Sequence, residues 1–352
     1  MSPLAIVRLV CAVVVLASTA VGVFVFGRAV ATIVNRMRVG RPVPRERLRP
    51  VGRRLVRMLA EVVGHTAFKG RPWIRAAHWL VMVSFPLLFL TLVTGYGQVL
   101  AHPAWELPWL GRQAWWAWVV ELIAWLSTAG ILHMIAVRRR RTRRGAADPS
   151  FPDAEESATR PRTSRFAGSS AAQAHFVEAV VAGVVACVLV LRMLEHARLA
   201  VSEDAAERAL AGWTHFPLTA WSGPLLEPLG STGLAIAITV VATIKVVVSM
   251  SWFVVVGLQP SMGVAWHRFL AFVNLYARRS TDGTKALGPA EPLLLPDGRP
   301  LTAETMDDLD DAMEAVEERG EEVALGVGRI QDFTWKGLLD FSTCTECGRC
   351  QD

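Results

Sequence analysis

Five apolar segments constrain the fold of this chain more than any other feature of its sequence. Each is longer than the roughly 20 residues that a helix needs to cross the hydrocarbon core of a bilayer. In that core every backbone N–H and C=O group must be hydrogen-bonded within the protein, which favours helices. The sequence therefore predicts an all-α membrane protein whose five transmembrane helices form a bundle. The predicted spans are about 4–34, 73–100, 114–137, 173–199 and 231–257.

The distribution of arginine predicts how the bundle is oriented. Only Arg8 precedes the core of the first apolar segment, whereas arginine is frequent in 36–57 and again in 138–144. Cytoplasmic loops carry the excess of Lys and Arg, so we expect both of these segments in the cytoplasm and the N-terminus outside. The same flanks argue against a cleaved signal peptide. With five spans, the C-terminal end then lies in the cytoplasm.

A net charge of +6 is also compatible with nucleic-acid binding. The basic blocks, however, flank membrane-length apolar segments, and lipid headgroups explain that position better. We therefore expect the lipid bilayer to be the partner of the basic residues, and we expect no nucleic acid.

The chain divides into a five-helix membrane domain, 1–279, and a cytoplasmic segment, 280–352. Inside the membrane domain, 145–171 is rich in Ala, Ser, Pro and charged residues without periodicity, which predicts a disordered cytoplasmic linker. Apolar residues recur at helical spacing between Leu55 and Val63, which predicts a short helix lying at the membrane interface.

The cytoplasmic segment contains three recognisable local signals. Pro296-Asp297-Gly298 predicts a turn within an extended or hairpin stretch. The acidic stretch 302–318 predicts a helix with Thr302 as its N-cap. A second short helix is expected from Phe333 to Phe341, directly before a cysteine motif.

That motif contains three cysteines at C-x-x-C-x-x-C spacing, Cys344, Cys347 and Cys350. In bacterial ferredoxins this spacing lets one loop present three thiolates to a 4Fe–4S cluster, and thiolates select iron–sulfur or zinc over metals that prefer oxygen ligands. A zinc knuckle or a redox pair remains the alternative, although no nearby histidine offers a fourth zinc ligand. Clustered thiolates belong in a reducing compartment, which agrees with a cytoplasmic C-terminal end. The sequence thus predicts the start of a ferredoxin-like iron–sulfur domain.

In the ferredoxin pattern a fourth cysteine follows three residues after the third, which here falls beyond Asp352. We therefore expect the chain to be the front part of a longer protein, cut inside its first cluster motif and inactive alone. By contrast, Cys11 and Cys187 lie in apolar segments and are expected to be buried small hydrophobic residues.

Histidines are the candidate ligands of a b-type haem, which needs two imidazoles from different helices at the same depth. His78 lies roughly 8 Å inside the cytoplasmic end of the second span, at about 1.5 Å per residue. His267 follows the fifth span beyond a kink expected at Pro260. These two are the predicted axial ligands, and headgroup contact is the open alternative for each. His133 and His196 are candidates for a second haem. The histidines not expected to bind haem are His65, His102, His175 and His215.

Ionisable residues inside the apolar spans are costly and are functional candidates by default. Arg192 and Glu195 are three residues apart on one helix and are expected to pair. Lys245 has three open roles: neutralising a carboxylate of the fourth span, contacting a haem propionate, or binding a quinone carbonyl. Arg192 is a further candidate for the propionate or quinone contact. The other two such residues are Glu121 and Glu178.

The stretch from Gly326 to Asp352, GVGRIQDFTWKGLLDFSTCTECGRCQD, resembles the entry to the iron–sulfur region of heterodisulfide-reductase-like membrane oxidoreductases. Within that group it is most similar to the membrane-bound electron-transfer-flavoprotein:menaquinone oxidoreductases. The five-span part resembles the gamma subunit of respiratory nitrate reductase, a quinol-oxidising haem b protein.

This resemblance implies haem ligands at matching positions. The family has a histidine near the cytoplasmic end of the second span, which matches His78, and a Pro-Ser motif, a His and an Asn after the fifth, which match Pro260-Ser261, His267 and Asn274. Relatives with two haems have further histidines deeper in both spans. Here those depths hold Leu87, Leu88 and Phe89 in one span and Lys245 and Ser249 in the other.

The resemblance also implies a function in the cytoplasmic (inner) membrane of a bacterium. Electrons would pass from a cytoplasmic donor, reduced electron-transfer flavoprotein, through 4Fe–4S clusters and haem b to menaquinone. One alternative is the membrane module of a thiol/disulfide or hydroxy-acid oxidoreductase. Another is a haem-free membrane anchor for an iron–sulfur enzyme. The sequence identifies no catalytic residue.

Overall fold

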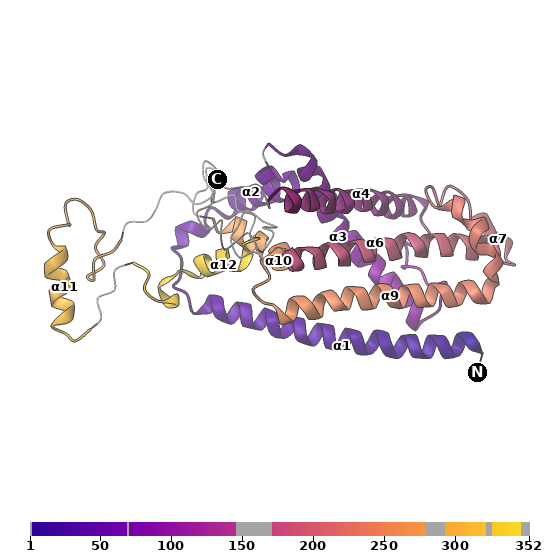
Figure 1. Cartoon of the computed structure of the whole chain (residues 1–352), viewed down its shortest axis with the longest axis horizontal. Helices are drawn as coiled ribbons and strands as arrows, with labels where there is room; N and C mark the ends of the chain where they lie inside the picture. The colour runs from indigo at the N-terminus through magenta and orange to yellow at the C-terminus, as the bar shows by residue number, and fades with distance from the viewer. Residues whose placement is uncertain (1, 69, 146–170, 279–292, 322–325, 346–352) are drawn as a thin grey trace. The chain divides into compact units, whose positions relative to one another are not determined.

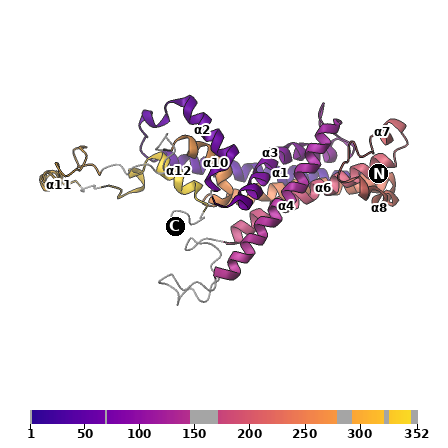
Figure 2. The same cartoon turned by 90° about the horizontal axis from the view of Figure 1, so that it is seen from above.

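The computed structural model describes residues 2–68, 70–145, 171–278, 293–321 and 326–345 (Figures 1 and 2). The described chain is helical, and its β pairings are isolated bridges between Arg41 and Thr334 and between Leu294 and Pro300. Residues 146–170, which contain nearly all of the predicted linker, lie outside the described residues.

Five helices are long and apolar enough to cross a membrane, which confirms the predicted all-α, multi-pass architecture. They match the predicted spans to within a few residues, except at the C-terminal ends of α1 and α4. These two helices continue through their arginine-rich flanks, because arginine is a good helix former once the chain has left the apolar core. The helices are α1 (Pro3–Arg38), α3 (Pro72–Leu100), α4 (Ala114–Gly145), α6 (Ala171–Ala200) and α9 (Gly230–Leu258).

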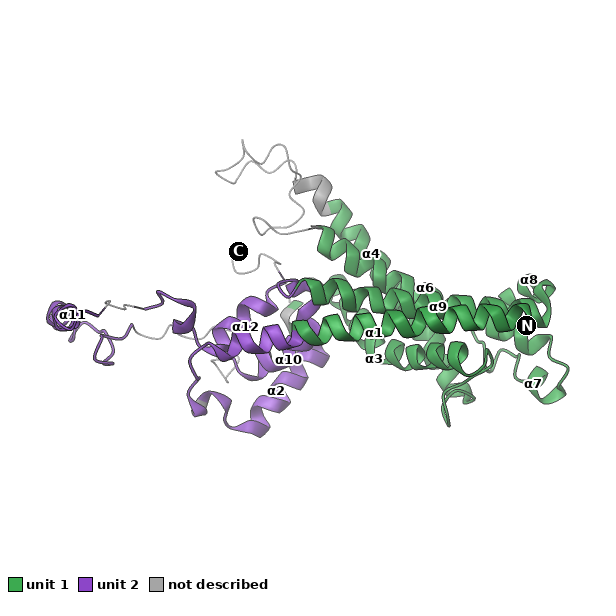
Figure 3. Cartoon of the chain, turned by 90° about the horizontal axis from the view of Figure 1, so that it is seen from below, with its two compact units in different colours: residues 1–29, 65–259, 346–352 green, residues 30–64, 260–345 purple. Residues whose placement is uncertain are grey.

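The chain forms two compact units, coloured separately in Figure 3. Unit 1 comprises residues 1–29, 65–259 and 346–352. Unit 2 comprises residues 30–64 and 260–345.

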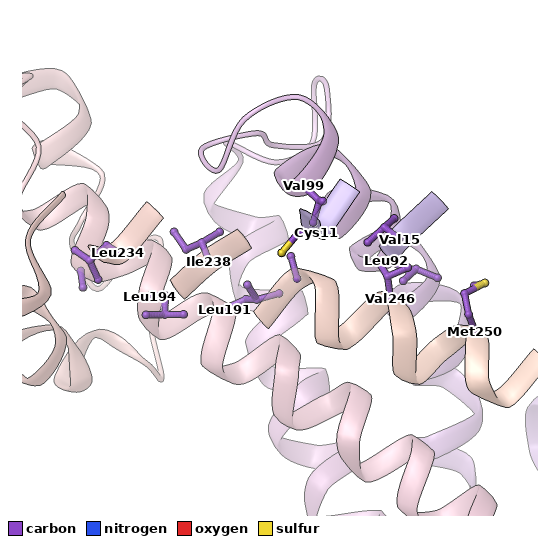
Figure 4. Packing of buried hydrophobic residues seen from close by; sticks show 12 residues of the cluster. Cys11, Val15, Leu92, Val99, Leu191, Leu194, Leu234, Ile238, Val246 and Met250 are labelled. Carbon is purple, nitrogen blue, oxygen red and sulfur yellow. The ribbon is translucent and has the colours of Figure 1, made fainter. Parts of the chain in front are cut away.

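The core of unit 1 is centred on α9, which packs along α6 and α3. One face of α9 buries Leu234, Ile238, Ala242 and Val246 at intervals of four residues, the spacing that places side chains on one side of a helix. Figure 4 shows how residues of α1, α3 and α6 meet this face. The residues that meet it include Cys11, Val15, Leu92, Val99, Leu191 and Leu194. Cys11 is buried as expected, whereas Cys187 is only partly buried.

Apolar side chains that the core does not bury lie on the outside of unit 1. On α1 they include Leu9, Val13, Leu16 and Phe24, all more than half exposed. Exposed apolar side chains along a helix of this length are typical of a surface that faces lipid.

In unit 2, α2 (Val51–Gly64) is attached to the end of α10 (Gly263–Tyr276) by a buried arginine. The Arg54 guanidinium donates to the backbone carbonyl oxygens of Tyr276 and Arg278 at 3.1 and 2.8 Å. Burial lowers the pKa of Arg54 from its ordinary value, and the carbonyl oxygens replace the water that it loses. Another side of α2 exposes Leu55, Leu59 and Val63. The predicted short helix is therefore present, and its position at the membrane interface stays a prediction.

The local predictions for unit 2 were partly right. The Pro296 turn is present, with the Leu295 N–H donating to the Arg299 carbonyl oxygen at 2.8 Å. Thr302 is not an N-cap: α11 (Leu309–Glu317) starts seven residues later, after Asp308. The reason is local, because the Thr305 hydroxyl bonds the Thr302 N–H and the Pro300 carbonyl and so forms a turn.

The helix break after the fifth span is also observed. Helix α9 ends at Leu258 and α10 begins at Gly263, on either side of Pro260. Proline has no N–H for the helical ladder and its ring clashes with the preceding turn, which explains the break.

Candidate functional site

Helix α12 (Trp335–Thr343) carries the first motif cysteine at its C-terminal end. It lies within two residues of the predicted Phe333–Phe341. The Thr334 hydroxyl caps its N-terminus by accepting a hydrogen bond from the Gly337 N–H at 3.2 Å. Cys344 leaves the helical conformation and is exposed, while its N–H still donates to the Phe341 carbonyl oxygen at 3.3 Å. Cys347 and Cys350 lie outside the described residues.

The end of α12 lies against the start of α10, within unit 2. Gly263 is the first residue of α10, and a Cβ there would collide with the carbonyl oxygen of Cys344. The side-chain amide of Asn274 also donates to the Thr343 hydroxyl. Because only glycine lacks a Cβ, Gly263 permits this close approach.

His267 lies one turn beyond Gly263 on the same helix and is half-buried. Its Nδ1 is 3.3 Å from the Gly263 carbonyl oxygen. Since a carbonyl can only accept, Nδ1 carries the proton in this contact. Gly263 therefore touches both predicted redox residues of unit 2: its Cα faces the Cys344 backbone and its carbonyl oxygen accepts from His267. The neighbouring Arg268 is also desolvated, and burial lowers its pKa to about 10.

The other predicted haem ligand, His78, lies in the second turn of α3 in unit 1. Its Nδ1 is 2.8 Å from Nε2 of His65, and the ring of Phe68 lies 5.1 Å from its own ring. Directly before it, Ala77 approaches α4 so closely that a Cβ on Gly130 would be 3.0 Å from the Ala77 carbonyl oxygen. His78 is thus fixed on one side by a second imidazole. His78 belongs to unit 1 and His267 to unit 2, so their pairing stays a prediction.

Three donors of unit 1 converge on the buried carboxylate of Glu121, on α4. Its side chain accepts from the Arg192 guanidinium at 3.1 Å, the Thr219 hydroxyl at 2.6 Å and the Leu218 N–H at 2.8 Å. Arg192 also donates to Glu195 at 2.9 Å, which is the expected pair within α6. Gln98 donates to the other oxygen of Glu195 at 2.7 Å. The network thus pairs one guanidinium with two carboxylates and fully satisfies Glu121.

Lys245 lies deep in unit 1 with 1% of its surface exposed. Its ammonium donates to the backbone carbonyl oxygen of Thr91 on α3 at 2.6 Å. Among the described residues, no carboxylate forms a salt bridge with Lys245, although the charge of Glu195 acts on it. The observed partner of Lys245 is thus a backbone carbonyl oxygen of α3, and the three roles predicted for this residue stay open.

The remaining candidates lie apart from these groups. Glu178 pairs with Arg138 at 2.7 Å and with His175 at 3.1 Å, so it is a satisfied ion pair. His133 is exposed on α4. The Nε2 of His196 is 2.9 Å from the Ala211 carbonyl oxygen. Its Nδ1, which has no hydrogen-bond partner among the described residues, packs against Gly223, where a Cβ would collide with the ring.

His65 is the residue that sequence reasoning missed, since it was expected only at the interface. The available signal was the turn that follows it. Gly70 adopts a positive φ of 75° and Pro72 starts α3, residue types that reverse and restart a chain. The turn at these residues allows His65, which precedes α3, to contact His78 in the second turn of that helix.

No family model, curated protein or solved structure matches the chain. Within the described residues, no group of three or more His, Cys, Asp or Glu side chains could hold a metal ion.

Proposed function

We propose that this chain is the membrane module of a quinone-linked oxidoreductase in the cytoplasmic membrane of a bacterium. It would pass electrons from a cytoplasmic donor through 4Fe–4S clusters and haem b to menaquinone. The single observation that supports this best is the contact of Gly263 with both Cys344 and His267. Gly263 thus contacts two residues that are far apart in the sequence. Each of them is predicted independently to bind a redox group.

Cys344, Cys347 and Cys350 would supply three thiolates of the first cluster. The backbone of the first of them lies against α10, so this proposed ligand would be held before any metal binds. Within α12, the buried Lys336 ammonium donates to the more exposed Asp340 at 2.6 Å, one turn further along the helix. The role of Gly263 is to let the cluster loop approach α10 without an intervening side chain.

His78 and His267 would hold haem b, which supplies a one-electron carrier when bound. The donor chemistry of both residues fits that role. In each imidazole Nδ1 is engaged, by His65 in one case and by the Gly263 carbonyl oxygen in the other. Coordination would therefore use Nε2 of both residues, with the other ring nitrogen oriented by a partner, as is usual for histidine ligands.

The orientation and the donor belong to the same proposal. The arginine-rich ends of α1 and α4 and the cysteine motif would face the cytoplasm, and the donor would be reduced electron-transfer flavoprotein. Lys245 and Arg192 remain candidates for contact with quinone or a haem propionate. Against the propionate role, Arg192 already has two carboxylate partners within the protein.

The test is a reduced-minus-oxidised spectrum of membranes that contain the protein. We expect a low-spin b-type signal that is lost in His78→Ala and in His267→Ala. The matched controls are His102→Ala and His215→Ala, which should keep the signal. An unchanged spectrum in both ligand variants would reject this haem site, and no b-type signal in the unmodified protein would favour the haem-free anchor. Reduction of menaquinone by reduced electron-transfer flavoprotein tests the donor.

A further inference from the structure

His65 has a backbone conformation that is uncommon for residues other than glycine. Its φ is 48°, and among the described non-glycine residues only His65 and Trp109 have a positive φ. L-residues rarely adopt this region, and such residues cluster at functional sites where the surrounding structure holds them. His65 is also 8% exposed, so the strained residue is a buried one.

The side chain of His65 is held between two rings. Phe68 stacks on it at 5.6 Å between centroids with an angle of 7° between planes. On another side its Nε2 lies 2.8 Å from Nδ1 of His78. The backbone closes the same turn, since the Phe68 N–H donates to the His65 carbonyl oxygen at 3.2 Å. Two ring contacts and a backbone hydrogen bond therefore fix the position of the His65 imidazole.

The hydrogen bond between the imidazoles has two possible directions, and only one is compatible with iron binding by His78. If His65 donated, Nδ1 of His78 would be the acceptor and its Nε2 would carry the proton of a neutral ring. A protonated nitrogen has no lone pair for iron. If His78 donates from Nδ1, its Nε2 keeps the lone pair, and the accepting His65 makes the ligand more basic.

We propose that His65 is a positioning residue for the haem ligand His78. It accepts a hydrogen bond from Nδ1–H of His78, fixes the tautomer that presents Nε2, and increases the basicity of that nitrogen. This inference rests on the proposed function, because it assumes that His78 binds haem iron. A more basic axial ligand favours ferric over ferrous iron, so His65 lowers the midpoint potential of the haem.

The experiment compares His65→Gln with His65→Leu in detergent-purified protein. The two side chains are similar in size and carry the same backbone cost at a positive φ, but only Gln can accept a hydrogen bond. The readouts are the midpoint potential from redox titration and the g-values of the ferric haem. We expect His65→Leu to change the ferric-to-ferrous equilibrium about tenfold, which raises the potential by ~59 mV for one electron, and His65→Gln to stay near the unmodified value.

A packing control separates this role from a structural one. Phe68→Leu removes the ring that stacks on His65 but leaves the acceptor, so its potential should stay close to the unmodified value. Loss of haem in His65→Leu with retention in His65→Gln would also support the proposal. Equal potentials and g-values in Gln and Leu variants would overturn it, as would a shift in Phe68→Leu as large as that in His65→Leu. If the unmodified protein contains no haem b, the proposed function itself fails.

Discussion

The carbonyl oxygen of Cys344 occupies the space that a side chain on Gly263 would need. Gly263→Ala should therefore push the end of α12 away from α10. Overpacking of this kind costs about 1–3 kcal/mol, and we expect a comparable loss of stability together with lower iron and sulfide content. The measurement is thermal unfolding in detergent, with metal analysis of the same preparations.

Gly52→Ala is the matched control for this variant. Gly52 lies on α2 in the same unit, is exposed, and has nothing within 4 Å of a built Cβ. Alanine is the better helix former, so this variant should be as stable as the unmodified protein or slightly more stable. Equal behaviour of the two variants would contradict the importance of the Gly263 contact.

Removing Glu121 should destabilise unit 1 strongly. Glu121→Ala leaves the Thr219 hydroxyl and the Leu218 N–H without their acceptor and removes one carboxylate from Arg192. Breaking one side of a buried ion pair costs about 3–5 kcal/mol. The check is denaturant or thermal unfolding followed by tryptophan fluorescence.

Glu106→Ala provides the comparison, because its pair with Arg112 is solvent-accessible. Exposed pairs contribute about 0–1 kcal/mol, so this variant should unfold almost like the unmodified protein. The stability of Glu121→Gln should lie between that of Glu121→Ala and that of Glu106→Ala, because glutamine keeps an acceptor but loses the charge. A loss of less than about 1 kcal/mol in Glu121→Ala would show that the network adds little.

The ion pair between Asp332 and Arg41 predicts a pH dependence for unit 2. Asp332 accepts from the N–H groups of Arg329 and Gly328 and from the Arg41 guanidinium. These donors, the Arg329 N–H foremost, hold the pKa of Asp332 below its ordinary value of 3.8. Because the folded-state pKa is depressed, the stabilisation is present above the ordinary pKa and is lost as the pH falls through the folded-state pKa.

Asp332→Asn should therefore lower the melting temperature near neutral pH and should lose less further stability on acidification than the unmodified protein. The measurement is thermal unfolding at several pH values between about 6 and 3, which brackets the ordinary carboxyl pKa. Parallel curves for the two proteins over this range would mean that Asp332 titrates in the same way folded and unfolded.

Reporter fusions test the orientation of the bundle. A cytoplasmic reporter should be active at residue 150 and inactive in the loops 101–113 and 200–230, because we expect the arginine blocks at the ends of α1 and α4 to stay on the cytoplasmic side. Removing the arginines of 138–144 should weaken the signal at 150. An external signal at residue 150 in the unmodified chain would contradict the orientation.

The spans could be predicted because length and hydropathy alone decide them, and the five helices fall where those quantities place them. Contacts between distant residues were not predictable in the same way. The Arg192–Glu195 pair follows from helical spacing, but the third member, Glu121, comes from another helix. His65 was missed because its contact with His78 depends on one positive φ, and Thr302 was misassigned because a local turn competes with the helix.

The Glu121 network also has a consequence for how the protein is made. Glu121 precedes Arg192 by 71 residues and Thr219 by 98. At a synthesis rate of about 5–20 residues per second, Glu121 is made roughly 4–14 s before Arg192. Helix α4 is therefore made before any of the three donors that bind Glu121, and the site can be completed only when α6 and the segment after it arrive.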